Sequence, residues 1–340
     1  MSLTERIVPF TAGDGVALNL INVRSSTRAP HRGPVIVVHG AGVRANIFRA
    51  PGQATIVDAL AAAGYDVWLE NWRASIEFPP REWTLDQAAL YDHPQAVRKI
   101  VAETGYDKIK AIIHCQGSTS FSMSALAGLV PEVTTIVSNA VSLHPVVSGW
   151  ARIKLNYAVP VVNALTTYLN PHWGVEAPTL VAKGITALVK LFHHECRNTV
   201  CKMVSFTYGS GFPALWRHEN LTESTHEWLK EEFGDVPLRF FKQIGRCVRQ
   251  GHLVAVEGLP GLPADFTAAP QIGARFAFFA GAKNRCFLPE SQQRSWQFFD
   301  ALRPGFHSLH VLPEYSHLDM FMGKNAATDV FPLMIRELDK

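Results

Sequence analysis

Two patterns of hydrophobic residues alternate along the first 141 residues of the chain. Short runs of apolar, often β-branched residues separate longer stretches in which apolar residues recur every three or four positions. The runs predict buried strands, and the stretches predict amphipathic helices. Strands are expected at 35–38, 65–69, 108–113 and 133–141, and helices at 55–64, 84–105 and 118–129.

This alternation is typical of βαβ units, so the expected fold class is α/β, with a mostly parallel central sheet and helices on both faces. The opening RIVPFTAGDGVALNLINVRS predicts two further strands joined by a turn at Asp14–Gly15. In parallel sheets ligands bind at the carboxyl ends of the strands. Two unusual loops are expected there, HGAG at 39–42 and HCQGS at 114–118.

The pattern changes in the middle of the chain. Apolar stretches with a helical period replace the strand signals, which predicts an inserted helical cap over the sheet. After Pro270 the alternation returns, with a helix at 290–305 and a last helix at 325–340. We therefore expect a first core part at 1–142, the cap at 143–261 and a second core part at 262–340.

Composition narrows the classes of function. The 340 residues are 47% hydrophobic and 18% charged, with a formal net charge of +3, which indicates a globular chain and gives no support for a nucleic-acid partner. No secretory signal and no membrane span is expected. Five scattered cysteines are not a disulfide framework, so a cytoplasmic location is predicted. The oligomeric state stays open, and a homo-oligomer is compatible with the sequence.

The stretch KIKAIIHCQGSTSF, residues 108–121, carries the main candidate chemistry. A strand, a tight turn with one reactive residue and then a helix describe a nucleophile elbow, and Cys115 stands at its tip. Gly117, two residues later, is small as the turn requires, whereas Ile113 departs from the pattern. A thiol at a helix N-terminus beside an imidazolium is expected to have a lowered pKa.

Three other segments supply the expected partners of Cys115. The glycine-flanked Ala41 and the residue after the nucleophile, Gln116, are the candidate backbone N–H donors of an oxyanion hole. His317, on the loop after the last predicted strand, is the candidate base. Asn284 is the candidate third residue, because Cys-His-Asn sites need it only to orient the ring, and Glu290 is the open alternative.

His114 is the competing histidine. Its side chain is expected to point away from Cys115 across the turn, which favours a packing role. His193-His194-Glu195-Cys196 with Cys201 matches no familiar zinc spacing, so no metal is expected. Neither a Gly-x-Gly-x-x-Gly turn nor a Walker loop is present, so no cofactor is expected.

With these motifs in place, the chain resembles an α/β-hydrolase over nearly its full length. The pieces ENWRAS, HCQGSTSFSMSALAGL and YSHLDMFMGKNAATDVFP are similar to the hydrolase-like domains associated with cholesterol-oxidase-like (glucose–methanol–choline) oxidoreductases, as are THEWLKEEFG and FTYGSGF. Dienelactone hydrolases and polyhydroxyalkanoate synthases resemble it in placing cysteine at the elbow. Both usually carry an acidic third residue, which Asn284 is not.

The expected function is cleavage of an apolar ester, lactone or thioester through a covalent thioester on Cys115. Two alternatives remain open. One is an acyltransferase or synthase that uses the same Cys-His site with an alcohol or amine acceptor. The other is a catalytically inactive binding protein on a hydrolase fold. In each case the expected partner is an apolar small molecule or acyl group.

Overall fold

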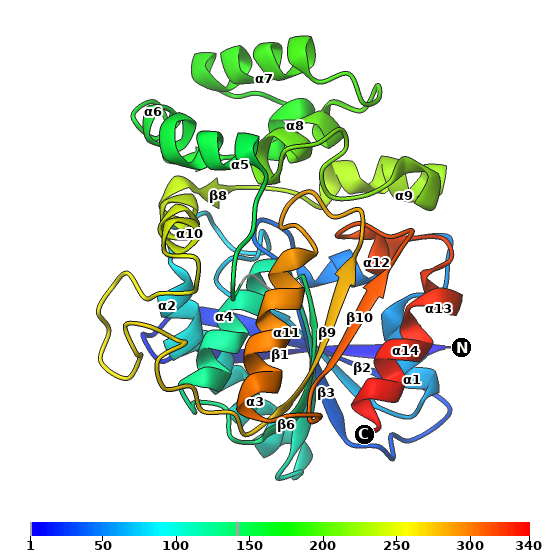
Figure 1. The fold of residues 1–340 in the computed structure, drawn as a ribbon. Helices are drawn as coiled ribbons and strands as arrows, with labels where there is room; N and C mark the ends of the chain where they lie inside the picture. Colours follow the sequence, from blue (N-terminus) through cyan, green and yellow to red (C-terminus); the bar gives the residue numbers. More distant parts are fainter. Residues whose placement is uncertain (1, 141–142) are drawn as a thin grey trace.

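The computed structural model describes residues 2–140 and 143–340, which are built around one eight-stranded sheet (Figure 1). Its strand order is β1-β2-β4-β3-β5-β6-β9-β10. β2 pairs antiparallel with β1 and β4, and the other neighbours pair in parallel. The strands are β1 (Leu3–Thr11), β2 (Ala17–Ser25), β3 (Pro34–Val38), β4 (Asp66–Asn71), β5 (Ile109–His114), β6 (Val133–Asn139), β9 (Arg275–Gly281) and β10 (Ser308–Leu312).

Helices cover both faces of this sheet, as the expected α/β class requires. Helices α1 (Ile56–Ala62) and α14 (Phe331–Leu338) lie on one face in Figure 1. The other face carries α3 (His93–Thr104), α4 (Cys115–Leu126) and α11 (Glu290–Leu302). Shorter helical turns are η1 (Ala45–Phe48), α2 (Leu85–Gln87), η2 (Ala88–Asp92), α12 (Asp319–Met322) and α13 (Ala326–Asp329).

The sequence signals explain most of these boundaries. β3 is buried along its whole length, as its β-branched run predicts. Thr55 and Asp58 form a reciprocal capping box at the start of α1. The single helix expected at 84–105 is instead interrupted, because Pro94 in the first turn of α3 has no N–H to donate and the chain widens into the π-helical turn η2 just before α3.

The described residues between β6 and β9 are mostly helical up to α10, and most of their helices lie beyond the carboxyl ends of the parallel strands (Figure 1). Their elements are α5 (Gly149–Ile153), η3 (Lys154–Ala158), α6 (Val159–Asn163), β7 (Tyr168–Leu169), η4 (Pro171–Gly174), α7 (Leu180–Phe192), α8 (Thr199–Tyr208), η5 (His218–Asn220), α9 (Glu223–Trp228), η6 (Leu229–Glu231), β8 (Val236–Pro237) and α10 (Leu238–Gln250). The paired strands β7 and β8 are too short to leave a period in the sequence. Residue 142, the expected end of the first core part, lies outside the described residues, and we propose 143–261 as the cap.

None of the helices within residues 2–140 and 143–340 combines the length and the apolar character needed to cross a bilayer.

One ion pair is buried beside the carboxyl end of β4. The guanidinium of Arg73 donates from Nε and Nη2 to the carboxylate of Asp92, with a shortest distance of 2.6 Å, and the backbone N–H of Arg73 donates to the same group. Both side chains are almost fully enclosed. The pair fixes the loop after β4 against η2.

We predict that Asp92→Ala lowers the free energy of unfolding by about 3 kcal/mol, because it leaves the Arg73 guanidinium buried with Asp14 as its remaining carboxylate partner among the described residues. Urea unfolding followed by circular dichroism measures the change. Glu103→Ala removes the partly exposed pairs with Arg6 and Lys99 and is the matched control, with an expected loss of about 1 kcal/mol or less. Equal effects of the two substitutions would contradict the assignment.

Candidate active site

Cys115 lies at the sharp turn between β5 and α4 in a left-handed backbone conformation, with φ of 56°. This conformation costs a non-glycine residue about 1–3 kcal/mol. Gly117 makes the turn possible, since a Cβ there would lie 2.1 Å from the carbonyl oxygen of His39. Ile113, which departs from the expected pattern, is fully buried at the end of β5 and does not prevent the turn. The strand–turn–helix geometry expected around Cys115 is therefore present.

Two backbone N–H groups converge on the sulfur of Cys115. Gln116 and Ala41 each donate a backbone hydrogen bond to it. Gly40 allows this approach of the HGAG loop, because a Cβ at that position would lie 2.8 Å from the Cβ of Cys115. The two residues expected to form an oxyanion hole thus present their donors at one point.

His317 lies close to Cys115. A ring nitrogen of His317 is within 4.8 Å of the sulfur, and its Nδ1 is 3.1 Å from Nδ2 of Asn284. The loop that carries His317 is fixed by buried Asp319, whose carboxylate accepts from the N–H of Ser316 at 2.7 Å. Three sequence-distant segments therefore bring cysteine, histidine and asparagine together.

The two alternatives weighed from the sequence have different outcomes. Glu290 is exposed at the start of α11, so Asn284 and not Glu290 is the residue that contacts His317.

The expectation that the side chain of His114 points away from Cys115 is wrong. Its ring lies against that of His317, with centroids 4.7 Å apart, because Asn139 holds its Nδ1 at 2.9 Å and turns the ring toward the cavity.

Burial sets the protonation states of the site. It raises the pKa of the Cys115 thiol to about 12, more than the two N–H donors lower it, and it lowers the pKa of His317 to about 3. The lowered thiol pKa expected from the helix N-terminus is therefore wrong for this enclosed state. At neutral pH the site holds a thiol and a neutral imidazole rather than an ion pair.

The amide of Asn284 also fixes which nitrogen of His317 carries the proton. Its Oδ1 accepts from the backbone N–H of Cys286 at 2.9 Å, so its NH₂ group faces Nδ1 of His317. An NH₂ group can only donate, so Nδ1 is the acceptor and Nε2 carries the hydrogen. Nε2 has no hydrogen-bond partner within the described part of the chain.

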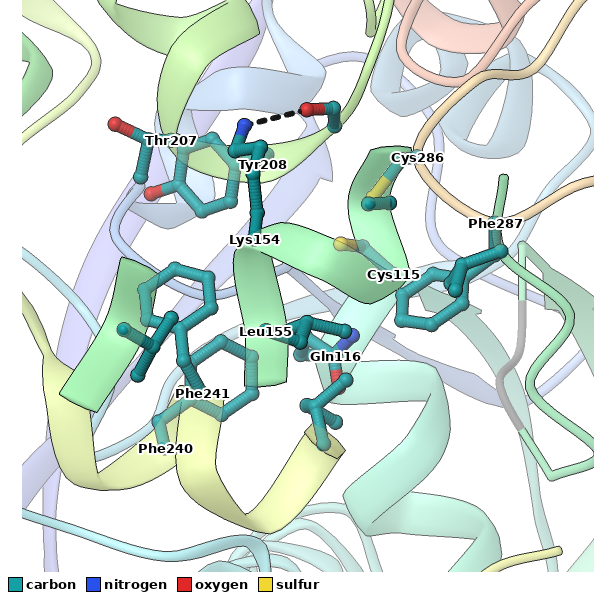
Figure 2. A pocket seen from close by; sticks show the side chains of 15 residues that line it. Cys115, Gln116, Lys154, Leu155, Thr207, Tyr208, Phe240, Phe241, Cys286 and Phe287 are labelled. Carbon is teal, nitrogen blue, oxygen red and sulfur yellow. Dashed lines mark hydrogen bonds between the residues drawn. The ribbon is translucent and has the colours of Figure 1, made fainter. Parts of the chain in front are cut away.

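An apolar pocket opens on Cys115 from the cap side (Figure 2). It contains about 570 Å³ of space not filled by atoms. Aromatic and aliphatic side chains dominate its wall, including Leu155, Phe240, Phe241 and Phe287. Sequence reasoning missed this set, because residues from η3, α8, α10 and the loop before α11 meet only in the fold.

Lys154 is the charged residue among the pocket-lining side chains. Its ammonium donates to the carbonyl oxygens of Phe206 and of Gly209, the latter at 2.7 Å, and burial lowers its pKa to about 8.

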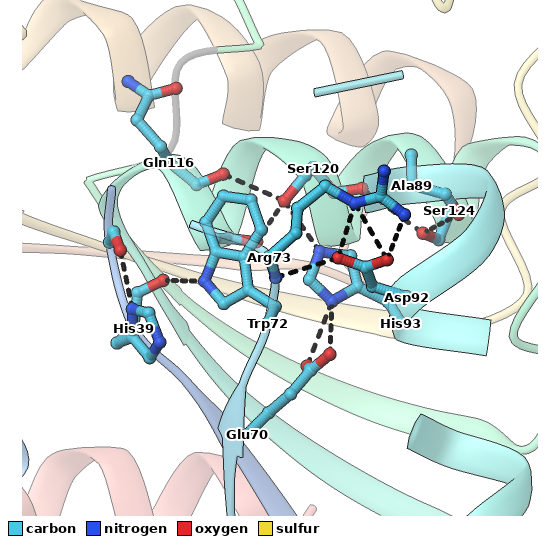
Figure 3. A network of polar contacts seen from close by, with 12 residues as sticks. His39, Glu70, Trp72, Arg73, Ala89, Asp92, His93, Gln116, Ser120 and Ser124 are labelled. Carbon is cyan, nitrogen blue, oxygen red and sulfur yellow. Dashed lines mark hydrogen bonds and ion pairs between the residues drawn. The ribbon is translucent and has the colours of Figure 1, made fainter. Parts of the chain in front are cut away.

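A serine–histidine–carboxylate arrangement connects β4, α3 and α4 (Figure 3). His93 contacts both carboxylate oxygens of Glu70 at 3.0 Å and the hydroxyl of Ser120 at 2.7 Å. The hydroxyl itself donates to the carbonyl oxygen of Gln116 at 3.1 Å. Ser120 is fully enclosed and does not line the pocket, so this chain of hydrogen bonds braces the first turns of α4.

Potential metal ligands occur at two places in the described ranges. The candidate ligand atoms of His114, Cys115 and His317 lie within 4.8 Å of one another. Three protein ligands with an open fourth position could hold a catalytic zinc. The second place is in the cap and lies apart from this pocket.

Comparison with known proteins supports the architecture. A family model described as alpha/beta hydrolase fold matches residues 33–172. Human lipase member K is 27% identical over 371 residues, which cover 96% of this chain and 85% of the lipase. Sterol esterase 2 of Saccharomyces cerevisiae is 24% identical over 157 residues, 39% of this chain. That match spans only 29% of the sterol esterase, less than a third of its length.

Solved structures agree with this comparison. The esterase EaEST from Exiguobacterium antarcticum has a TM-score of 0.59 at 10% identity, covering 98% of this chain and 99% of its own. An esterase from Pyrococcus furiosus has a TM-score of 0.54 at 14% identity, covering 99% and 91%. At these identities the likeness establishes the fold alone. Together with the strand order and the family match over residues 33–172, it shows that the chain has the α/β-hydrolase fold.

Proposed function

We propose that this chain is a cysteine-dependent hydrolase that cleaves an apolar ester, lactone or thioester. The observation that carries the proposal is the convergence of the Ala41 and Gln116 N–H groups on the sulfur of Cys115 at a strained turn. In this position the same donors can hold the oxygen of a carbonyl that the sulfur attacks.

The proposed reaction proceeds through a thioester. The sulfur of Cys115 forms a bond to the carbonyl carbon, the carbonyl π electrons move to oxygen, and the thiol proton passes to Nε2 of His317. The intermediate collapses, the bond to the leaving group breaks, and His317 returns the proton to that group. Water then attacks the thioester carbonyl and transfers a proton to His317, the carbon–sulfur bond breaks, and His317 returns the proton to the sulfur, which restores the thiol.

This sequence sets a condition on Asn284. Nε2 of His317 can accept the thiol proton only when Nδ1 carries the ring hydrogen, and then Asn284 must present Oδ1 to Nδ1. The hydrogen bond from Cys286 N–H to Oδ1 holds the amide in the opposite orientation. Rotation of the amide is therefore the step that prepares His317 as a base, and a carboxylate at this position would not need it.

Pocket chemistry and relatives favour an apolar acyl substrate. The wall of the pocket is largely aromatic and aliphatic, which suits an acyl chain or ring system. Proteins named as a sterol esterase and as lipases are among the relatives. The five free cysteines support the expected reducing compartment. The likeness to oxidoreductase-associated domains stays a prediction.

A non-catalytic binding protein is the second candidate, favoured by the raised thiol pKa and by the proton on Nε2 of His317. Acyl transfer to an alcohol or amine is the third, since either acceptor could replace water in the second step. Product analysis in the presence of added alcohols separates transfer from hydrolysis.

We predict that Cys115→Ala lowers kcat/KM for medium-chain p-nitrophenyl esters and acyl thioesters at least about 1000-fold, because it removes the atom that forms the acyl bond. Acid-quenched intact mass should show the acyl group on Cys115 in the unmodified protein. Cys247→Ala, a buried cysteine outside the pocket, is the matched control and should turn over normally. Unchanged turnover in Cys115→Ala would contradict the proposal, and binding without any adduct would favour the binding protein.

We predict that Asn284→Asp raises kcat/KM at least about tenfold and moves the acid limb of the pH profile to higher pH. A carboxylate can accept from both Cys286 N–H and Nδ1–H of His317, which leaves the lone pair on Nε2 and stabilises the imidazolium. Steady-state kinetics across pH measures both effects. Asn139→Asp, which faces His114 instead, is the control and should bring no gain. A folded Asn284→Asp protein with lower activity would show that the amide is needed as a donor.

A further inference from the structure

Four side chains of the cap converge at a point away from the pocket. Cys196 lies in the loop between α7 and α8, Cys201 in the first turn of α8, His218 in η5 and His226 in α9. Each offers one ligand atom, and the four atoms lie within 4.8 Å of one another. Four separate segments therefore meet at two thiols and two imidazoles.

The distances within this cluster match a tetrahedral ion site. The sulfur of Cys201 is 3.3 Å from Nε2 of His218, and that of Cys196 is 3.8 Å from Nε2 of His226. Zinc bonds of about 2.3 Å to sulfur and about 2.0–2.1 Å to nitrogen give tetrahedral edges of about 3.3–3.8 Å between ligand atoms. The two rings are perpendicular, with centroids 4.9 Å apart, so each directs Nε2 inward without blocking the other.

We propose that Cys196, Cys201, His218 and His226 bind one zinc ion. Two thiolates and two neutral imidazoles are a donor set that zinc favours, and the two thiolate charges balance those of the ion. With four protein ligands the ion has no open position, so its role is structural rather than catalytic.

Spacing explains why the sequence leads to the opposite expectation. Adjacent His193 and His194 suggest ligands beside Cys196, but neither belongs to the cluster, and the ring of His193 packs edge-on against Phe212. The two histidines that do converge follow Cys201 on separate helical turns. Their separation exceeds the usual spacing of zinc fingers, so no local motif shows it.

The backbone around the cluster is arranged to hold it. The side chain of Asn198 accepts from the N–H groups of Val200 and Cys201 at the start of α8, and its Nδ2 donates to the carbonyl oxygen of His226 at 3.0 Å. Asn198 thus joins α8 to α9 in the way that supporting residues orient metal ligands.

Zinc at this point would connect the cap to both sides of the candidate active site. His218 follows Leu215, whose carbonyl oxygen accepts from the N–H of His317 at 3.2 Å. At the far end of α8 from Cys201, Tyr208 lines the pocket and donates to the carbonyl oxygen of Ala41 at 3.1 Å. The ion would therefore hold the cap in the position at which pocket and His317 loop are complete.

Metal content of the purified protein is the first test. Plasma mass spectrometry should find one zinc per chain after dialysis against a weak chelator, and Cys196→Ser or His218→Ala should lower the retained zinc at least about tenfold. His194→Ala and Cys247→Ser are the matched controls and should retain it. Metal-free protein in every preparation, including one refolded with zinc, would overturn the proposal.

Cobalt replacement reads the ligand set in the unsubstituted protein as well as in the variants, and bound cobalt without sulfur ligation in the unsubstituted protein would by itself overturn the proposal even if a variant fails to fold. Cobalt in the refolded protein should show the absorption of a tetrahedral ion with sulfur-to-cobalt charge transfer. Retention of those bands in Cys196→Ser with their loss in His317→Ala would move the ion to the active site and overturn the proposal. A Cys196–Cys201 disulfide in protein kept under reducing conditions would also overturn it.

Discussion

The left-handed backbone at Cys115 is the constraint on which the rest of the site depends. Parallel strand β5 delivers the residue to the cap side of the sheet, and α4 begins directly after it. The turn is held because Gly117 lets the chain pass against His39, and Gly40 lets the HGAG loop approach the sulfur. Residues of other types at either glycine would push apart the two N–H donors. Fold and chemistry therefore meet at one strained position, as is common at functional sites.

Burial of the site also changes the pKa values of Cys115 and His317. A cysteine at a helix N-terminus gains from the helix dipole, but here the loss of water outweighs that gain and keeps the thiol protonated. The same burial keeps His317 neutral. The proposed reaction therefore requires proton transfer during attack rather than a preformed ion pair, which makes the third residue of the proposed site more important. Asn284 can orient the ring, but it cannot balance an imidazolium charge as a carboxylate would.

The sequence predicts the parts of this account that have local signals. The buried run of β3, the glycines after α1 and α3 and the elbow around Cys115 all follow from period, turn chemistry and burial. Asn284 and His317 follow from chain order. The contacts that choose between alternatives are long-range, so the sequence leaves Glu290 open and misplaces His114. The pocket wall and the cap cluster likewise need four separate segments to meet, and neither has a local pattern.

The central claim is that the sulfur of Cys115 is the reacting atom, and that burial keeps the Cys115 thiol protonated and the His317 imidazole neutral. The most direct test is the rate of iodoacetamide labelling of Cys115 across pH, followed by peptide mapping. With a pKa near 12, the rate should rise about tenfold per pH unit from pH 7 to pH 10 without a plateau. A plateau below pH 8 would show a preformed thiolate and contradict the account. If Cys115 stays unlabelled until the protein unfolds, it is not a reacting group, and only the assignment of the fold would remain.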